Sequence, residues 1–377
     1  MKQSPTGALG WGVFASCSWL WSIGMFLPLL LLRDWGWTGF LVFAIPNVLG
    51  TLLFGLVVTP DGCRRIQAEH GHAVIGFSIV TVVFQLFFIG MIMRLVGLDL
   101  SDSVLVMLAA YGAAIGLSVM PTRSWPWIAG CLYVFSFIVL LVPPAGGLDV
   151  AGSAGRLDTS LIYWAIPTFI FGFMLCPVLD GTFHEARERG GSMAFVVFAI
   201  AFSLLLIGTA LLFDGALLVL ARVVCIHMVL QAIFTSAAHA RATRQVPMIP
   251  GTTGHHLSGL LLGLAPLIAW LIMVLPWTFE SVYLGFMIFY GLFFPAYVIL
   301  LIHPSWWPVP MAIARNRGLI SWTIACLVGI PLYQMGFMGK MTWLLPIPLM
   351  MILSLALLDM NNRGRQRDAT MEPSSTP

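Results

Sequence analysis

Polar side chains that could do chemistry stand at a few positions within otherwise apolar stretches of the sequence. Asp180 lies in the stretch 161–186, which is long and apolar enough to enter a bilayer. A carboxylate at such a depth marks a pathway or a buried pair more often than a lipid-facing surface. The same stretch contains four residues that break helices and free backbone groups: Pro167, Gly172, Pro177 and Gly181. Two interpretations stay open, a broken membrane helix that lines a site and a kinked helix in which Asp180 caps the next element near the lipid headgroups.

A second group of polar residues recurs every four positions in the apolar stretch near 216–238: His227, Gln231, Thr235 and His239. On a helix this spacing places them in one drifting stripe, with Ser236 beside it and Arg222 beyond it. The stripe is either a wet or ion-bearing face or ordinary hydrogen bonding between helices, with the hydroxyls bonded back to their own helix. We favour the functional interpretation because Arg222 and His227 are costly in lipid without a partner. Asp180 is the natural candidate partner for either.

The first apolar stretch, 8–32, is also dense in small, hydroxyl-bearing and helix-breaking residues: Ser16, Ser18, Ser22, Gly24 and Pro28. A helix interrupted at these positions would turn backbone carbonyls and hydroxyls toward a shared cavity. We therefore expect three segments to line a substrate pathway, through Ser18, Ser22, Gly24, Cys176, Asp180, Arg222 and His227.

Composition places these segments in a membrane. Hydrophobic residues make up 59% of the 377 residues and charged residues only 9%, with a mean hydropathy of +0.96. Soluble domains carry about a quarter charged residues. About twelve apolar stretches of roughly 17–25 residues can be marked, and no gap between them is long enough for a soluble domain. The fold class is therefore an all-α polytopic membrane protein with a single transmembrane bundle over residues 1–358.

The positions of the basic residues predict the orientation. With spans near 8–32, 36–58, 73–96, 104–120, 125–142, 161–183, 192–213, 216–238, 257–277, 281–302, 318–337 and 341–358, one side holds only Arg33, Arg94, Arg156 and Lys340. Apart from Arg222 within a span, all other Lys and Arg fall on the opposite side, which the positive-inside rule assigns to the cytoplasm. We expect a cell membrane location, the bacterial inner membrane, with both termini cytoplasmic. Residues 359–377 are expected to form a disordered tail.

Internal similarity predicts an inverted repeat. Spans 1 and 6 share a Gly…Pro break, and each is followed by a span with a Phe-Ala-Ile triplet, at 43–45 and 198–200. Five spans separate the start of one unit from the start of the next, so the two copies have opposite orientations. Repeat one covers about 8–142 and repeat two about 161–302, with two extra helices over about 318–358.

Sequence motifs for catalysis or metal binding are weak compared with these membrane features. The histidine pairs are HxH at 70–72 and HH at 255–256, whereas membrane metal oxidases need spacings that bring two imidazoles onto one metal. There is no Walker or GxSxG motif, and the six cysteines contain no CxxC pair. We expect no enzyme, no bound cofactor, no resident metal and no nucleic-acid partner.

The segments SWLWSIGMFLPLLLLRDWGWTGFLVFAIPNVLG and LCPVLDGTFHEAR, with two broken spans and two five-helix units, resemble the LeuT-fold transporters of the amino acid–polyamine–organocation superfamily. They look like a bacterial branch near the sodium:solute symporters. The resemblance implies a sodium ion between the break of span 1, near Ser18, and a hydroxyl pair on span 8, which Thr235 and Ser236 match.

The expected function is an ion-coupled secondary transporter of a small solute, working by alternating access. Sodium is favoured as the coupling ion because of the hydroxyl pair. Protons stay possible as the coupling ion because Asp180 lies close in sequence to His184, and a histidine can titrate near neutral pH. The alternative is a membrane sensor or scaffold that retains the fold without transporting.

Overall fold

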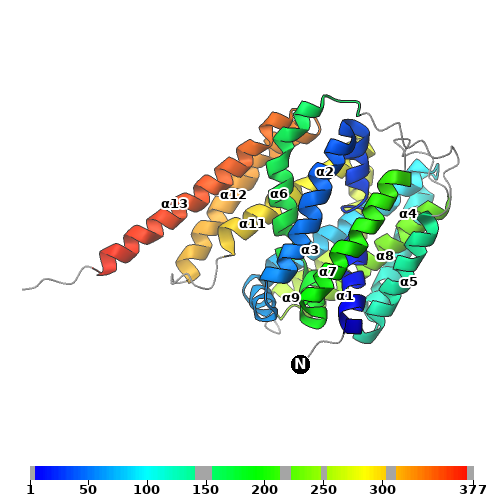
Figure 1. Cartoon of the computed structure of the whole chain (residues 1–377), viewed down its shortest axis with the longest axis horizontal. Coiled ribbons are helices and arrows are strands. Elements are labelled where there is room, and N and C mark those ends of the chain that lie inside the picture. Colours follow the sequence, from blue (N-terminus) through cyan, green and yellow to red (C-terminus); the bar gives the residue numbers. More distant parts are fainter. Residues whose placement is uncertain (1–4, 141–154, 213–221, 248–252, 303–310, 372–377) are drawn as a thin grey trace, which may run out of the picture.

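A computed structural model describes residues 5–140, 155–212, 222–247, 253–302 and 311–371 (Figure 1). Within these ranges the chain forms helices joined by turns and contains no β-strand. Nine of the described helical segments are long and apolar enough to cross a membrane. The predicted class, a helical membrane protein, is therefore confirmed.

The helices follow one another along the chain as α1 (Pro5–Ser18), α2 (Phe26–Val57), α3 (Pro60–Leu95), α4 (Leu100–Ser118), α5 (Trp125–Leu140), α6 (Ile166–Leu175), α7 (Gly181–Leu212), α8 (Arg222–Gln245), α9 (Thr253–Met273), α10 (Phe279–Ile288), α11 (Phe294–Leu301), α12 (Met311–Phe337) and α13 (Pro346–Met371). Short 3-10 segments complete them, including η1 (Thr122–Ser124), η2 (Thr159–Ala165), η3 (Cys176–Leu179) and η5 (Thr342–Leu344), and a π-helix, η4 (Phe289–Phe293), joins α10 to α11.

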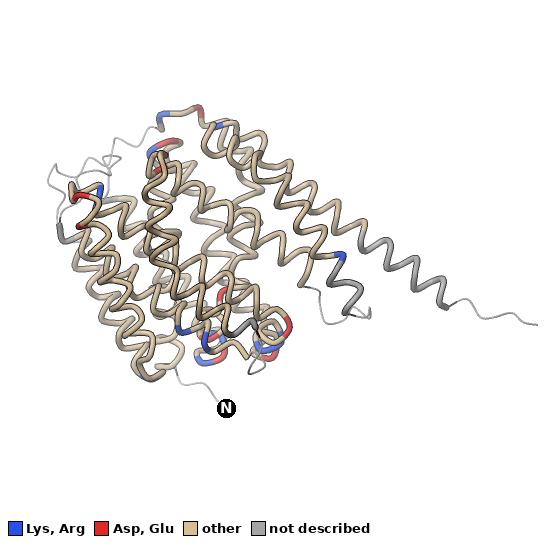
Figure 2. The backbone as a smooth tube through the Cα atoms, turned by 180° about the vertical axis from the view of Figure 1, so that it is seen from behind, with Lys and Arg blue, Asp and Glu red and all other residues tan. Residues whose placement is uncertain are grey.

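Charged residues lie mostly toward the two ends of the bundle and leave the middle of the long helices almost free of charge (Figure 2). Because a charge in hydrocarbon is costly, this distribution suits a bundle whose middle lies in a bilayer. We call the end of the bundle at which α1 begins the inner end, and the opposite end the outer end (Figure 1).

The breaks expected in the first and sixth spans are both present. Between α1 and α2, residues 19–25 form turns instead of helix, and Trp21 adopts a left-handed backbone conformation with φ 57°. Between α6 and α7 the chain narrows to η3 and then leaves the helical region at Asp180, whose φ is −80° and ψ 107°. The helices are therefore interrupted in the two segments in which the sequence places glycine and proline residues.

Two connections between predicted spans are very short in the structure. Between the predicted spans 8–32 and 36–58 the chain leaves helical geometry at Trp35 and Gly36, so the expected connection is present although α2 runs on both sides of it. A similar kink occurs in α7 at Gly191, where φ is 69°. Glycine accepts this positive φ without steric cost, so each chain reversal needs only one or two residues.

The last helix is longer than expected. We predicted that the final span ends near 358 and that a disordered tail begins at 359, whereas α13 continues to Met371. Residues 359–371 include Asp, Met, Arg, Gln and Ala, several of which are good helix formers, and no proline interrupts them. Figure 1 shows α13 leaving the bundle beyond the ends of the neighbouring helices.

The core around the breaks is made by a few long helices. The helix α1 packs against α7 and α5, while α3 packs against α8 and α9. The helix α2 packs against α6 and α7. Both breaks are therefore enclosed by protein, which is the condition for non-helical backbone at membrane depth.

Candidate functional site

The first break is held open by side-chain and backbone hydrogen bonds. The indole Nε1 of Trp19 donates to Oδ1 of Asn47 on α2 at 2.8 Å. The carbonyl of Trp21 accepts from Met25 N at 3.2 Å and from Phe26 N at 2.9 Å, and α2 starts there. Trp19 and Trp21 are only 1% and 2% exposed. The break is therefore a fixed, aromatic-lined turn within the core.

The second break is organised by the carboxylate of Asp180, which is fully buried. Its Oδ1 accepts from Thr182 N at 2.8 Å, from Thr182 Oγ1 at 2.7 Å and from Phe183 N at 3.4 Å. These donors belong to the first turn of α7, where an Asp satisfies free backbone N–H groups. The other oxygen, Oδ2, has no hydrogen-bond partner in the part of the chain that the structure describes.

Both sequence interpretations of Asp180 therefore hold in part. It caps the next helix, as the second alternative required, yet it lies in the protein interior instead of near the headgroups.

The two breaks meet. The hydroxyl of Ser18, the last residue of α1, lies 2.9 Å from the hydroxyl of Thr182, and Thr182 donates to Asp180. The carbonyl of Ala15, also 2.9 Å from the Ser18 hydroxyl, is the alternative acceptor for its single proton. A chain of hydroxyls therefore leads from the end of α1 to the buried carboxylate between α6 and α7.

The polar stripe of α8 faces this region. Thr235 Oγ1 donates at 3.2 Å to the carbonyl of Cys17, one of the last residues of α1. Gln231 Nε2 donates to Ser136 Oγ on α5 at 3.1 Å, and His239 Nδ1 lies 3.3 Å from Ser78 Oγ on α3. The hydroxyl of Ser236 is buried and has no partner among the described residues. The two predicted ion-binding hydroxyls, those of Thr235 and Ser236, therefore lie in the protein interior, and Thr235 is hydrogen-bonded to α1.

Several buried polar atoms in the same region lack a hydrogen-bond partner within the described ranges: Ser16 Oγ, Trp21 Nε1, Ser22 Oγ, Asp180 Oδ2, His227 Nδ1, Gln231 Oε1, Ser236 Oγ and His239 Nε2. An unpaired buried polar group costs about 1–3 kcal/mol. Their concentration around two helix breaks is typical of a region that receives water, an ion or a polar solute.

One expected pairing does not form. We predicted Asp180 as the partner of His227, but His227 packs edge-on against Trp21 and Phe135, at ring centroid distances of 5.6 and 5.7 Å. The reason is the length of α8: His227 lies three turns from His239, and it is His239 that contacts Ser78 beside Gly181 and the second break. The side chain of Arg222 lies outside the described part of the chain.

The remaining predicted pathway residues lie in or beside the breaks. Gly24 is in the first break, where an added Cβ would stand 2.8 Å from the ring of Phe202 on α7. The carbonyl of Ser22 accepts from the phenol of Tyr283. Cys176, at the start of η3, is buried, and its thiol donates to the carbonyl of Tyr290 at 3.1 Å.

Sequence reasoning missed the polar face of α3, none of whose residues we predicted as part of the site. Ser78 contacts His239, and Thr81 pairs its hydroxyl with that of Tyr290 at 2.9 Å. The spacing of Ser78, Thr81 and Gln85 places them on one helical face and could have revealed it.

Charged residues close the inner end of the site. Glu185, one turn after Asp180, pairs with Arg241 of α8 at 2.8 Å and with Arg189 at 2.9 Å. The side chains of Glu185 and Arg241 are both 7% exposed. The two arginines lie over tryptophan rings, Arg241 on Trp125 and Arg189 on Trp11. This network ties α1, α7 and α8 together.

A second network lies toward the outer end. Arg33 forms two parallel hydrogen bonds to the carboxylate of Glu280 at the start of α10, at 2.7 and 2.9 Å. Its neighbour Asp34 accepts from Lys340, in the turn between α12 and α13, at 2.7 Å. These contacts tie the kink of α2 to α10 and to the C-terminal hairpin.

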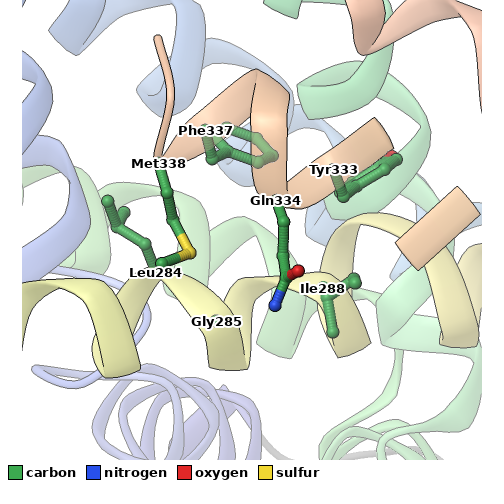
Figure 3. Close-up of a pocket in the computed structure, with 7 residues that line it drawn as sticks. All are labelled: Leu284, Gly285, Ile288, Tyr333, Gln334, Phe337 and Met338. Atoms are coloured by element: carbon green, nitrogen blue, oxygen red, sulfur yellow. The ribbon is translucent and has the colours of Figure 1, made fainter. Parts of the chain in front are cut away.

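A small pocket between α10 and α12 is separate from this site (Figure 3). Leu284, Ile288 and Met338 line it, and the amide of Gln334 points at α10. None of the predicted site residues lines it. In the described ranges no three His, Cys, Asp or Glu side chains converge as a metal site.

No protein-family model matches the sequence, and no curated protein matches it. The function of the site has therefore to be inferred from its geometry.

Proposed function

We propose that the protein is an ion-coupled secondary transporter that moves a small solute by alternating access. The observation that carries the proposal is the meeting of two helix breaks in the core, through Ser18 and Thr182, 2.9 Å apart. In transporters, discontinuous helices expose backbone and hydroxyl groups to a substrate or an ion near the middle of the bilayer.

Sodium is the coupling ion that the hydroxyls favour. Sodium is a hard cation, and oxygen ligands suit hard cations. The Thr235 hydroxyl lies 3.2 Å from the Cys17 carbonyl, and the buried Ser236 hydroxyl has no partner among the described residues. With Ser18 nearby at the end of α1, these oxygens could replace part of the water shell of a sodium ion.

The ion-pair networks support a cycle in which one end opens while the other stays closed. The inner network joins α1, α7 and α8 through Glu185 and Arg241, and the outer one joins α2 and α10 through Arg33 and Glu280. Opening an end would separate the paired charges and hydrate them. We include in the proposal twelve spans, the five-plus-five inverted repeat, a cell membrane location and cytoplasmic termini.

Counterflow in proteoliposomes tests the proposal. A panel of small solutes is exchanged with and without an inward sodium gradient, and we expect sodium to accelerate uptake of at least one of them. Replacing Thr235 and Ser236 together by alanine should abolish the sodium dependence. Thr323→Ala is the matched control, because Thr323 is an exposed hydroxyl on α12 that bonds only to its own helix at Leu319. Unchanged sodium dependence in the double variant would rule out the sodium site.

A sensor or scaffold is the second candidate, and one observation favours it. Trp19 and Trp21 fill the first break with two large buried side chains. Solute binding by thermal shift, together with no flux for the same solute, would support this alternative.

A further inference from the structure

Two buried ionisable side chains beside the second break, those of His184 and Asp180, lack opposite kinds of hydrogen-bond partner. The imidazole of His184 is fully buried, with Nε2 2.8 Å from the carbonyl oxygen of Val178 and Nδ1 3.3 Å from that of Cys63. Both ring nitrogens therefore face acceptors. A neutral imidazole has one N–H and can satisfy only one of them, whereas an imidazolium satisfies both.

Asp180 lacks a hydrogen-bond donor at one of its two carboxylate oxygens. Its Oδ1 has three donors from the first turn of α7, while its buried Oδ2 has none in the described chain. Helix capping explains Oδ1 and leaves Oδ2 unexplained. A proton on Oδ2, or a cationic group beside it, would remove the unbalanced charge.

With His184 neutral and Asp180 ionised, the pair buries a net negative charge. One added proton makes the pair neutral, either as carboxylic acid with imidazole or as carboxylate with imidazolium. Buried charge without compensation is strongly disfavoured in a low-dielectric interior. We infer that Asp180 and His184 together bind one exchangeable proton, beside the hydroxyls proposed for sodium, to which Thr182 and Ser18 connect Asp180.

Of the other ionisable groups around Asp180 and His184, only one can exchange a proton with them near neutral pH. The ionisable groups on the elements that pack around the pair include Cys63 of α3, Cys176 of η3, Tyr290 of η4, Glu185 of α7, and His239 and Arg241 of α8. Thiols and phenols are neutral near pH 7, and Glu185 and Arg241 neutralise each other. His239 remains as the group that can gain and lose a proton.

His239 is placed for this exchange. Its Nδ1 lies 3.3 Å from Ser78 Oγ, and its buried Nε2 is without a partner among the described residues. Gly181, directly after Asp180, stands against the same serine, since an added Cβ would lie 3.9 Å from Ser78 Oγ. No hydrogen bond joins Nε2 of His239 directly to Oδ2 of Asp180 among the described residues, so a proton would have to cross between them through a water molecule, leaving a neutral imidazole and a carboxylic acid.

The binding of this proton does not depend on transport, whereas its use as a second coupling ion rests on the proposed function. The test therefore needs a readout without flux. Infrared difference spectra between acid and alkaline pH, on the full chain in lipid, report protonated carboxyl and imidazole bands directly. We expect a carboxylic acid band in the wild type that exchanges with a carboxylate band as the pH rises.

Four variants assign the bands. Asp180→Asn keeps an oxygen to cap α7 and should lose the carboxylic acid band. His184→Gln should keep the band but shift its pH midpoint by about one unit. His239→Asn keeps a donor toward Ser78 and should slow proton exchange without removing the band. His72→Gln, at an exposed position of α3, is the matched control and should reproduce the wild type. A band unchanged in Asp180→Asn, or a midpoint unchanged in His184→Gln, would overturn the inference.

Flux measurements then separate the two proposals. An acid-outside gradient without a sodium gradient should drive uptake in wild-type proteoliposomes and not in Asp180→Asn. Infrared bands without any flux would refute transport and leave the proton site standing. Sodium-driven flux without the bands would refute the proton site and leave transport standing.

Discussion

The hydroxyls of Ser18 and Thr182 lie 2.9 Å apart in the core, although 164 residues separate them in the sequence. This contact joins the end of α1 to the start of α7, and Thr182 passes the link on to Asp180. Helix ends from two distant segments, each next to a break, therefore share one hydrogen-bonded centre, and changes at this centre should affect both segments.

Removal of the Thr182 hydroxyl tests that link. Thr182→Val keeps the side-chain shape and deprives both Ser18 Oγ and Asp180 Oδ1 of a partner, so we expect a loss of about 1–3 kcal/mol in stability. Thermal unfolding of the detergent-solubilised protein, followed by size-exclusion fluorescence, measures it. Thr182→Ser retains the hydroxyl and should stay close to the wild type. Equal melting temperatures for the Val and Ser variants would contradict the link.

The inner ion pair should be strongly coupled. Glu185 and Arg241 are both 7% exposed, and removing one partner leaves a buried charge, which costs about 3–5 kcal/mol. Glu185→Gln and Arg241→Met should each lower the melting temperature, and the double variant should lose less than the sum of both. The exposed pair of Asp61 and Arg64, with side chains 88% and 60% exposed, is the control and should show little coupling. Additive losses at Glu185 and Arg241 would disprove the expectation.

Close packing of α2 on α6 depends on Gly50. An added Cβ there would lie 2.6 Å from Cα of Met174, a backbone atom that cannot move aside alone. We expect Gly50→Ala to lower stability by about 1–3 kcal/mol. Gly76→Ala on α3 is the control, because its Cβ would meet no atom within 4 Å. A melting temperature as high in Gly50→Ala as in Gly76→Ala would mean that the two helices are less tightly packed.

The outer end of the C-terminal hairpin is held by Lys340. Its ammonium bonds to Asp34 at 2.7 Å and lies 4.9 Å from the centre of the Trp35 ring. Lys340→Met should increase hydrogen exchange in the turn between α12 and α13 and near the kink of α2, with other helices unaffected. Arg94→Gln serves as control, since Arg94 bonds only within its own turn, to the carbonyl of Leu98. Exchange that is equal in the two variants would show that Lys340 does not anchor the hairpin.

Much of the fold follows from local features of the sequence. Apolar stretches of membrane-spanning length predict helices, because in lipid each backbone group has to be bonded within its own segment. Helix breakers predict interruptions, and Gly24 and Pro177 do lie in or next to the two breaks. The four-residue spacing along α8 predicts a single polar stripe, and Gln231, Thr235 and His239 bond outward from it.

Only the tertiary structure decides which faces meet. Periodicity defines the polar face of α8 but not its neighbour, so His227 was expected at Asp180 and instead contacts Trp21. The polar face of α3 at Ser78 and the contact between Ser18 and Thr182 likewise depend on packing between segments far apart in the chain. Local sequence determines where a helix forms and breaks, because those energies are local. The partner across each interface depends on the packing of the whole bundle, which no single segment encodes.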